Sequence, residues 1–359
     1  MSVSRSAARL AAAAFAVGAL ALLGACTQPN LKPAQLLVAL PDYCNTPDGM
    51  ALLPDNSFIL SVPNYNNEKQ PPLLMRITPD NKAELWYKLP TVEGPNPVIY
   101  PMGISCAPSG DLYLADMQSN KSMDQKSRMW RIAVKDGKPE KLVLVASGFI
   151  VANGTTVHDG YVYITESVLE DGSHPLTSAV MRFKLGEENV QLKTPLKDDP
   201  HVIATFKSLK NDWRFGADGI AFDSKGNLFV GLFGEGEIWK IEFDPQGNVK
   251  SNKLFAKASC MKTCDGMSCD VRTDRIYLAD SANNAIQIIN PDGTVETLAR
   301  NGDFKNKLLG KLTQPCEAMV RGNTIVASNM NWPFPGFRSL THRLPATLSV
   351  IQLDPPPAK

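Results

Sequence analysis

One short pattern occurs six times along the chain: a residue pair that ends in glycine or alanine, followed by two short apolar strands joined by a turn. The pairs are Asp48-Gly49, Met102-Gly103, Asn153-Gly154, Asp218-Gly219, Asp265-Gly266 and Glu317-Ala318. Their first residues are separated by 54, 51, 65, 47 and 52 positions. Repetition at a nearly fixed period is typical of architectures in which each repeat is one supersecondary unit. The sequence therefore predicts an all-β, six-bladed β-propeller.

The last repeat lacks a fourth strand, because the chain ends soon after its third apolar run near Leu353. An unassigned apolar run at 36–40 lies before the first repeat. This run is expected to complete the last blade, which closes the ring and removes an exposed sheet edge. The expected single propeller domain spans residues 35–354, with a tail at 355–359.

Charge and composition argue against one large class of partners. The chain has 37 Lys and Arg against 36 Asp and Glu, and no basic stripe is interleaved with aromatic residues. Binding to nucleic acid normally requires such a basic face. We therefore expect no nucleic-acid partner.

The N-terminus is expected to be a targeting segment. Arg5 and Arg9 precede an apolar stretch at 10–24, which is followed by Cys26. The sequence Leu-Gly-Ala-Cys at 23–26 resembles the lipobox of bacterial lipoproteins, which predicts a signal peptide at 1–25, lipidation of Cys26, and a tether at 26–34. Thr27, in place of aspartate, resembles an outer-membrane sorting signal, so the expected location is the outer membrane, facing the periplasm. The alternative is an ordinary secretory signal with a coincidental cysteine.

An exported chain permits disulfides. Cys44 and Cys316 lie just before the first and last pairs, where a bridge would staple the closing ring. Cys260 and Cys264 are close enough in sequence for a local bridge. Cys106 and Cys269 occupy equivalent repeat positions and are expected to be small buried core residues.

The loops between second and third strands are the long, polar ones, and propeller topology places them all on one face. The last of these, at 329–345, carries Trp332, His342 and Arg343. Together with Met102 at the second pair, these residues are expected to bind a small-molecule substrate.

The first residues of the six pairs should converge on the propeller axis. Five of the six carry side-chain oxygens, and several are carboxylates, which repel one another when unpaired. Oxygen ligands of this kind suit a hard divalent cation: Ca²⁺ first, with Mg²⁺ or Mn²⁺ as alternatives. Because Asp-Gly is also a common turn dipeptide, the alternative is that the pairs are only turns. The expected metal ligands are Asp48, Asn153, Asp218 and Asp265.

At these residues the chain resembles the senescence marker protein/gluconolactonase family, the regucalcin-like six-bladed propellers. Its sharpest match is the stretch from Asp218-Gly219 to Gly226-Asn227-Leu228, close to the family's Asp-Gly…Gly-Asn-Leu motif. The resemblance implies that Asp48, Asn153 and Asp218 hold a divalent metal. Met102 departs from the pattern, since many members have asparagine there and a thioether is a poor ligand for a hard cation.

The expected function is metal-dependent hydrolysis of a lactone or similar cyclic ester. Asp218, by the resemblance, and Glu317, by its place on the last blade, are the expected catalytic carboxylates. Two alternatives stay open. One is a non-catalytic ligand- or protein-binding propeller with a structural cation. The other is chemistry like that of strictosidine-synthase-like propellers, in which Glu317 acts as the acid or base.

Overall fold

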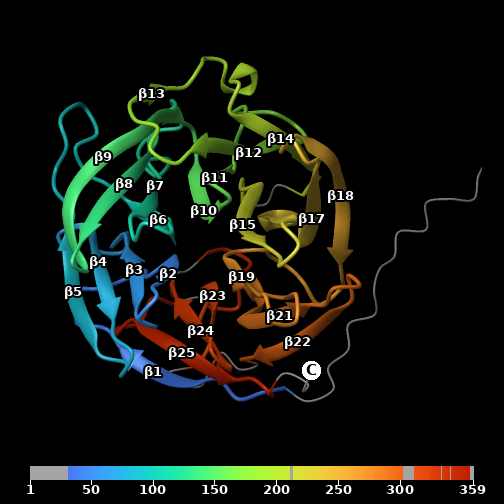
Figure 1. Cartoon of the computed structure of the whole chain (residues 1–359). Coiled ribbons are helices and arrows are strands. Elements are labelled where there is room, and N and C mark those ends of the chain that lie inside the picture. Colours follow the sequence, from blue (N-terminus) through green and yellow to red (C-terminus); the bar gives the residue numbers. More distant parts are fainter. Residues whose placement is uncertain (1–30, 211–212, 302–310, 333, 340, 356–359) are drawn as a thin grey trace, which may run out of the picture.

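The computed structural model describes residues 31–210, 213–301, 311–332, 334–339 and 341–355. Its strands form six sheets arranged radially around one axis (Figure 1). The innermost strands β2, β6, β10, β15, β19 and β23 surround that axis. The predicted all-β, six-bladed propeller is confirmed.

Each blade is an antiparallel meander whose strands are numbered outward from the axis. Blade 1 contains β2 (Met50–Leu52), β3 (Phe58–Val62), β4 (Leu73–Ile77) and β5 (Ala83–Lys88). Blade 2 contains β6 (Pro101–Cys106), β7 (Leu112–Asp116), β8 (Ser127–Lys135) and β9 (Lys138–Phe149). Blade 3 contains β10 (Ala152–His158), β11 (Tyr161–Glu166), β12 (Leu176–Lys184) and β14 (Val202–Ser208). Blade 4 contains β15 (Ala217–Phe222), β16 (Leu228–Leu232), β17 (Glu237–Phe243) and β18 (Val249–Lys257). Blade 5 contains β19 (Met267–Asp270), β20 (Arg275–Asp280), β21 (Ala285–Ile289) and β22 (Val295–Arg300). Blade 6 contains β23 (Pro315–Arg321), β24 (Thr324–Asn329) and β25 (Thr347–Gln352). The short strand β13 (Val190–Gln191) adds a parallel fifth strand to blade 2.

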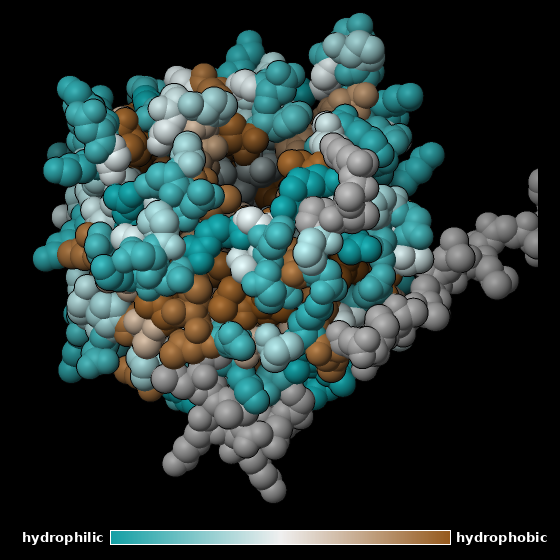
Figure 2. All heavy atoms as spheres, turned by 60° about the horizontal axis from the view of Figure 1, so that its bottom comes forward, coloured by the Kyte–Doolittle hydropathy of each residue, from teal (hydrophilic) through white to brown (hydrophobic). Residues whose placement is uncertain are grey.

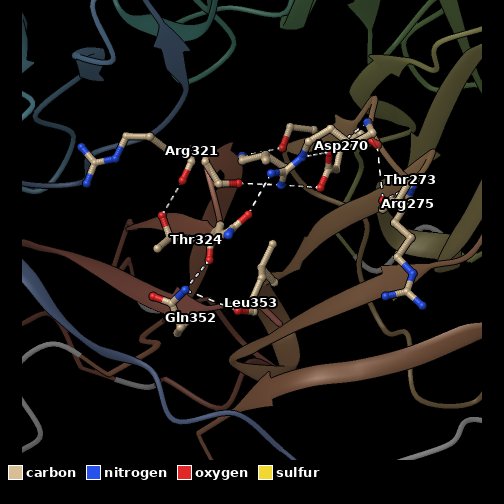
Figure 3. A network of polar contacts seen from close by, with 12 residues as sticks. Asp270, Thr273, Arg275, Arg321, Thr324, Gln352 and Leu353 are labelled. Carbon is tan, nitrogen blue, oxygen red and sulfur yellow. Dashed lines mark hydrogen bonds and ion pairs between the residues drawn. The ribbon is translucent and has the colours of Figure 1, made fainter. Parts of the chain in front are cut away.

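The N-terminal strand β1 (Gln35–Ala39) closes the ring, as predicted. It pairs antiparallel with β25, with Gln35 opposite Val350 and Ala39 opposite Thr347. Hydrogen bonds also join blade 5 to blade 6. The Arg272 side chain in blade 5 donates to Gly322 O at 2.6 Å in the turn between β23 and β24. Figure 3 shows the neighbouring contacts, in which the Gln352 side chain of β25 donates to the same turn at Asn323 O.

A polar side chain at or just after the end of each second strand fixes the loop that enters the same blade. Its oxygen accepts a backbone N–H from that loop in all six blades. The acceptors, which we call the loop anchors, are Asn64, Asp116, Glu166, Glu235, Asp280 and Asn329, and their donors include Asn45, Tyr100, Val151, Lys210, Thr263 and Thr313. Each of these loops leads to the pair that opens its blade, so the anchors set where the pair residues lie.

The glycine of each pair packs against the backbone of the next blade. A side chain at Gly103 would place its Cβ 2.5 Å from Asn153 O, and one at Gly219 would overlap Asp265 O. Such spacing leaves no room for a methyl group. The repeated glycine is therefore explained by close approach of neighbouring blades around the axis.

Substitution of Gly219 by alanine is expected to destabilise the fold by about 2–3 kcal/mol, the cost of overpacking a rigid backbone contact. Without the clash, alanine would make the fold more stable than glycine does at a strand position, so a loss of stability in this variant measures the clash. Urea unfolding of the variant measures the effect. The reverse change at the one pair that carries alanine, Ala318→Gly, is the matched control, with an expected loss of only about 0.5–1 kcal/mol. Equal effects of the two changes would contradict the packing argument.

The predicted signal peptide at 1–25 and the lipidation site Cys26 lie outside the described residues, and both stay predictions. Within the described ranges, none of the helices has the length and apolar character needed to cross a bilayer. The face shown in Figure 2 is polar around its edge and carries a group of apolar side chains toward its middle. Leu36 of β1 is 41 % exposed.

Two expectations about cysteines are wrong. Cys44, Cys264 and Cys316 are free thiols, so neither the ring-closing bridge nor the local Cys260–Cys264 bridge forms. The Cys316 thiol instead donates to Pro47 O at 3.1 Å, within the junction between blades 6 and 1. Cys106 and Cys269 are free, as expected, but both are partly exposed rather than buried.

Candidate functional site

The polar pair residues gather at one end of a cavity on the propeller axis. The cavity has a volume of about 260 Å³, and all six innermost strands contribute to its walls. The first residues of five pairs line it, namely Asp48, Asn153, Asp218, Asp265 and Glu317. We call these five residues the axial ring. The expected convergence is therefore present.

Hydrogen bonds hold the ring side chains in place. The Asn153 amide donates to the Asp218 carboxyl group and lies 3.3 Å from Ser167 Oγ. Glu317 accepts the backbone N–H of Ala318 at 3.0 Å. The Cys316 thiol lies beside the Asp48 carboxyl group and lowers its pKa. Since the contacts of Asn153 with Asp218 and of Cys316 with Asp48 join neighbouring blades, the ring is built from more than one blade.

The Ser281 hydroxyl links Asp265 to the neighbouring blade. Ser281 Oγ lies 2.6 Å from Asp265 Oδ2 and also 2.6 Å from Pro315 O. A hydroxyl has one proton to donate, so Ser281 donates to one of these two oxygens at a time. Its bond to Asp265 lowers the pKa of that acid, against the effect of burial.

Burial and mutual repulsion disfavour the charged forms of the ring acids. Burial raises the pKa of Asp48 to about 7, against the bond from Cys316, and raises the pKa of Glu317 to about 8. The pKa of Asp218 is raised well above its usual value by burial first and then by the charges of Asp265, Asp48 and Glu317. Burial and the charge of Asp48 likewise raise the pKa of Asp265. The metal-free ring is therefore a site that takes up protons.

No basic side chain of the described ranges forms an ion pair with these four acids. The ring offers carboxylate and amide oxygens, a donor set that fits Ca²⁺, Mg²⁺ or Mn²⁺. In the part of the chain that the structure describes, however, no three His, Cys, Asp or Glu side chains are grouped closely enough to hold one metal ion. The chemistry of the donors fits a cation, and its binding would require the side chains to come closer together.

Met102, the first residue of the remaining pair, does not belong to the axial ring. Its side chain is 6 % exposed and packs in an apolar cluster with Cys316, Met330 and Trp332. Tyr65 lies against it, with the phenol oxygen 3.5 Å from Met102 Sδ and 3.3 Å from Met117 O. The Tyr65 ring packs between Tyr100 and Trp332, at centroid distances of 5.3 and 4.8 Å. We call Tyr65, Tyr100, Met102 and Trp332 the roof.

The roof lies next to the ring. The pKa of Tyr65 is raised well above its usual value by burial first and then by the negative charges of Asp48 and Asp116. The Tyr65 backbone N–H also donates to Thr46 Oγ1, two residues before Asp48. The roof therefore covers the side of the ring on which the long loops lie.

The loop residues expected to bind substrate lie on this same side. The Trp332 ring packs against Tyr65 and Phe334 in tilted contacts. His342 Nδ1 is 2.8 Å from Asn66 Nδ2, and Arg343 O accepts a bond from Asn331. Neither these three residues nor Met102 lines the axial cavity. Their role in substrate binding stays a prediction.

Sequence reasoning missed Ser167 and Ser281, which contact the axial ring. Each follows a loop anchor directly, after Glu166 and Asp280. Each also reaches the neighbouring blade, through Ala217 O for Ser167 and Pro315 O for Ser281. The signal that identifies them is a serine directly after the polar residue that ends a second strand.

Comparison with known proteins shows the fold alone. No family model matches the sequence, and no curated protein does. Among solved structures, a gluconolactonase from Xanthomonas campestris has a TM-score of 0.57 and 11 % identity, over 90 % of each chain. Regucalcin from Agrobacterium tumefaciens, a calcium-binding protein, has a TM-score of 0.56 and 11 % identity, over 90 % of this chain and 96 % of its own.

Enzymes of other classes share the same architecture. An oxidoreductase of the glucose dehydrogenase type from Thermus thermophilus has a TM-score of 0.58 and 13 % identity, over 90 % of this chain and all of its own. The chain is thus a six-bladed propeller of the architecture seen in gluconolactonases and regucalcin. Because this fold carries several chemistries, the function has to be argued from the axial ring.

Proposed function

We propose that the chain is a divalent-cation-dependent hydrolase of a lactone or a similar cyclic ester. The observation that carries the proposal is the axial ring: four carboxyl groups and one amide around a single cavity, without a basic partner among the described residues. Asp48, Asn153, Asp218 and Asp265 would hold the cation. The proposal agrees with the likeness in fold to a gluconolactonase and to a calcium-binding regucalcin.

A cation bound to these oxygens would supply the Lewis acidity that polarises an ester carbonyl. The chain's own residues would do the rest. Asp218, oriented by the Asn153 amide, would accept the proton of the attacking water. Glu317 is partly exposed to the cavity and would return a proton to the ring oxygen of the lactone as the acyl C–O bond breaks. The product is the open hydroxy acid.

The test is a metal determination followed by a lactone panel. Purified protein stripped with a chelator is expected to lose lactone hydrolysis, and the rate should return on addition of Ca²⁺ or Mn²⁺. Equal turnover with and without chelator, in protein shown to be metal-free, would overturn the metal dependence. No turnover of any lactone by metal-loaded protein would overturn the hydrolase itself.

The roof favours one second candidate, a non-catalytic propeller in which the cation stiffens the axis. Tyr65, Met102 and Trp332 cover the ring on the side where a substrate was expected to approach. This candidate predicts a higher Tm with Ca²⁺ and no turnover. The same lactone panel therefore separates it from the hydrolase.

A further inference from the structure

The axial cavity extends from the ring toward the face opposite the roof. Its lining includes one apolar or thiol residue near the end of every innermost strand, namely Leu52, Cys106, Val157, Phe222, Cys269 and Met319. We call these six residues the lower mouth. Each is partly exposed, as are Asp265 and Glu317 at the ring, whereas Asp48, Asn153 and Asp218 are 5–7 % exposed. The cavity thus runs from the ring along the innermost strands to these partly exposed residues.

The roof contributes no side chain to this cavity, although it contacts the ring from the other side. Strand β6 contributes to both the cavity and the roof. Its residues Gly103 to Cys106 line the cavity, while the Met102 side chain is packed against Tyr65. The cavity and the loop-rich face are therefore separated by packed aromatic and thioether groups.

The charges along the cavity are of one sign. The charged residues among its described lining are Asp48, Asp218, Asp265 and Glu317, all at the ring. Below them the walls are apolar or carry small hydroxyl and thiol groups. An anion entering such a passage would lose its hydration between apolar walls and find no basic side chain to pair with among the described lining residues. An uncharged molecule with an apolar surface does not incur this cost.

We propose that ligands reach the axial ring through the lower mouth rather than through the loop-rich face, and that this passage selects small, uncharged, largely apolar lactones. The choice of substrate class rests on the proposed hydrolase function; the route does not. Leu52, Val157, Phe222 and Met319 are then the residues that determine specificity.

The route can be tested through Cys316, which lies at the level of the ring and lines the cavity. The probe is methyl methanethiosulfonate, a small neutral thiol reagent, and the readout is the modification rate of Cys316 by peptide mass spectrometry. The background variant Cys106→Ala/Cys269→Ala removes the other two thiols that line the cavity. Cys264, buried outside the cavity lining, is the internal control.

In this background, a plug at the lower mouth, Val157→Trp, is expected to slow modification of Cys316 by about tenfold or more. Opening the roof with Tyr65→Ala should leave the rate within about twofold. Met319→Trp serves as a second plug if Val157→Trp does not fold. Faster modification in Tyr65→Ala with no effect of either plug would overturn the route, as would modification of Cys316 no faster than that of Cys264.

The substrate class is tested in parallel by comparing kcat/KM for γ-caprolactone and for a lactone of similar size that carries a carboxylate. The uncharged lactone is expected to be preferred by about tenfold or more, and Val157→Trp should raise its KM. A preference for the anionic lactone would overturn the class. If no lactone is hydrolysed but the modification rate of Cys316 falls with the plug and is unchanged in Tyr65→Ala, the hydrolase function fails and the route stands.

Discussion

Substitution of Asp218 by asparagine is expected to lower kcat for lactone hydrolysis by about 10²–10⁴-fold, the usual contribution of a positioned general base. The amide keeps the shape of the side chain and can still accept the bond from Asn153. It cannot take a proton from water. The same change removes one of four mutually repelling acids, so the metal-free variant is expected to have a higher Tm than the native protein.

These opposite signs make the prediction specific. A variant that loses activity because it is misfolded would lose thermal stability as well. Steady-state kinetics and thermal unfolding, both on chelator-treated and on reloaded protein, give the two readouts. Asp198→Asn, at an exposed carboxylate in η1 (Leu196–Asp198), is the matched control and should change neither. Full activity in Asp218→Asn would remove Asp218 from the reaction.

The largest expected loss of stability follows from substitution of Asp280, the loop anchor of blade 5, by alanine. Its carboxylate accepts bonds from Lys262 N, Thr263 N, the Thr263 hydroxyl, Asn283 and Gln287, at 2.8–3.1 Å. Asp280 is fully buried. Alanine would leave these donors without an acceptor, at a cost of about 1–3 kcal/mol for each one that stays buried. We expect a loss of about 4–5 kcal/mol on this basis, measured by urea unfolding.

Asparagine at the same position is the matched control. Blades 1 and 6 use Asn64 and Asn329 as loop anchors, so an amide oxygen is sufficient for the loop contact. Asp280→Asn keeps one acceptor oxygen and is expected to lose about half as much stability as the alanine variant. If both variants were as stable as the native protein, the loop anchors would not be the groups that fix the entry loops.

Most of the architecture was predictable because the repeat is local. Each blade is formed by neighbouring strands, so the six pairs and the turns between them identify the meanders. The closing strand β1 was predictable because the pattern of apolar runs left blade 6 with three strands instead of four and left one apolar run unassigned. The two-residue strand β13 was not predictable, because it joins blade 2 from a segment in blade 3 and is too short to show a pattern.

The membership of the axial ring was predictable for the same reason, but its surroundings were not. Equivalent positions of a propeller converge, which brings Asp48, Asn153 and Asp218 together. The roof depends on a contact between Tyr65 and Met102, 37 positions apart, whose side-chain directions no pattern gives. Proximity to the pairs likewise suggested a bridge from Cys316, whose thiol instead points to Pro47 O and Asp48.

The close packing of the pair glycines has a consequence for which positions around the axis can change. Because these glycines lie directly against the backbone of the next blade, the main chain around the axis has little room to move. A substitution at one of these glycines moves the backbone of two blades, whereas the residue before it can be exchanged while the backbone stays in place. The chemistry of the axial site is therefore set by side chains on a backbone that does not have to change with them.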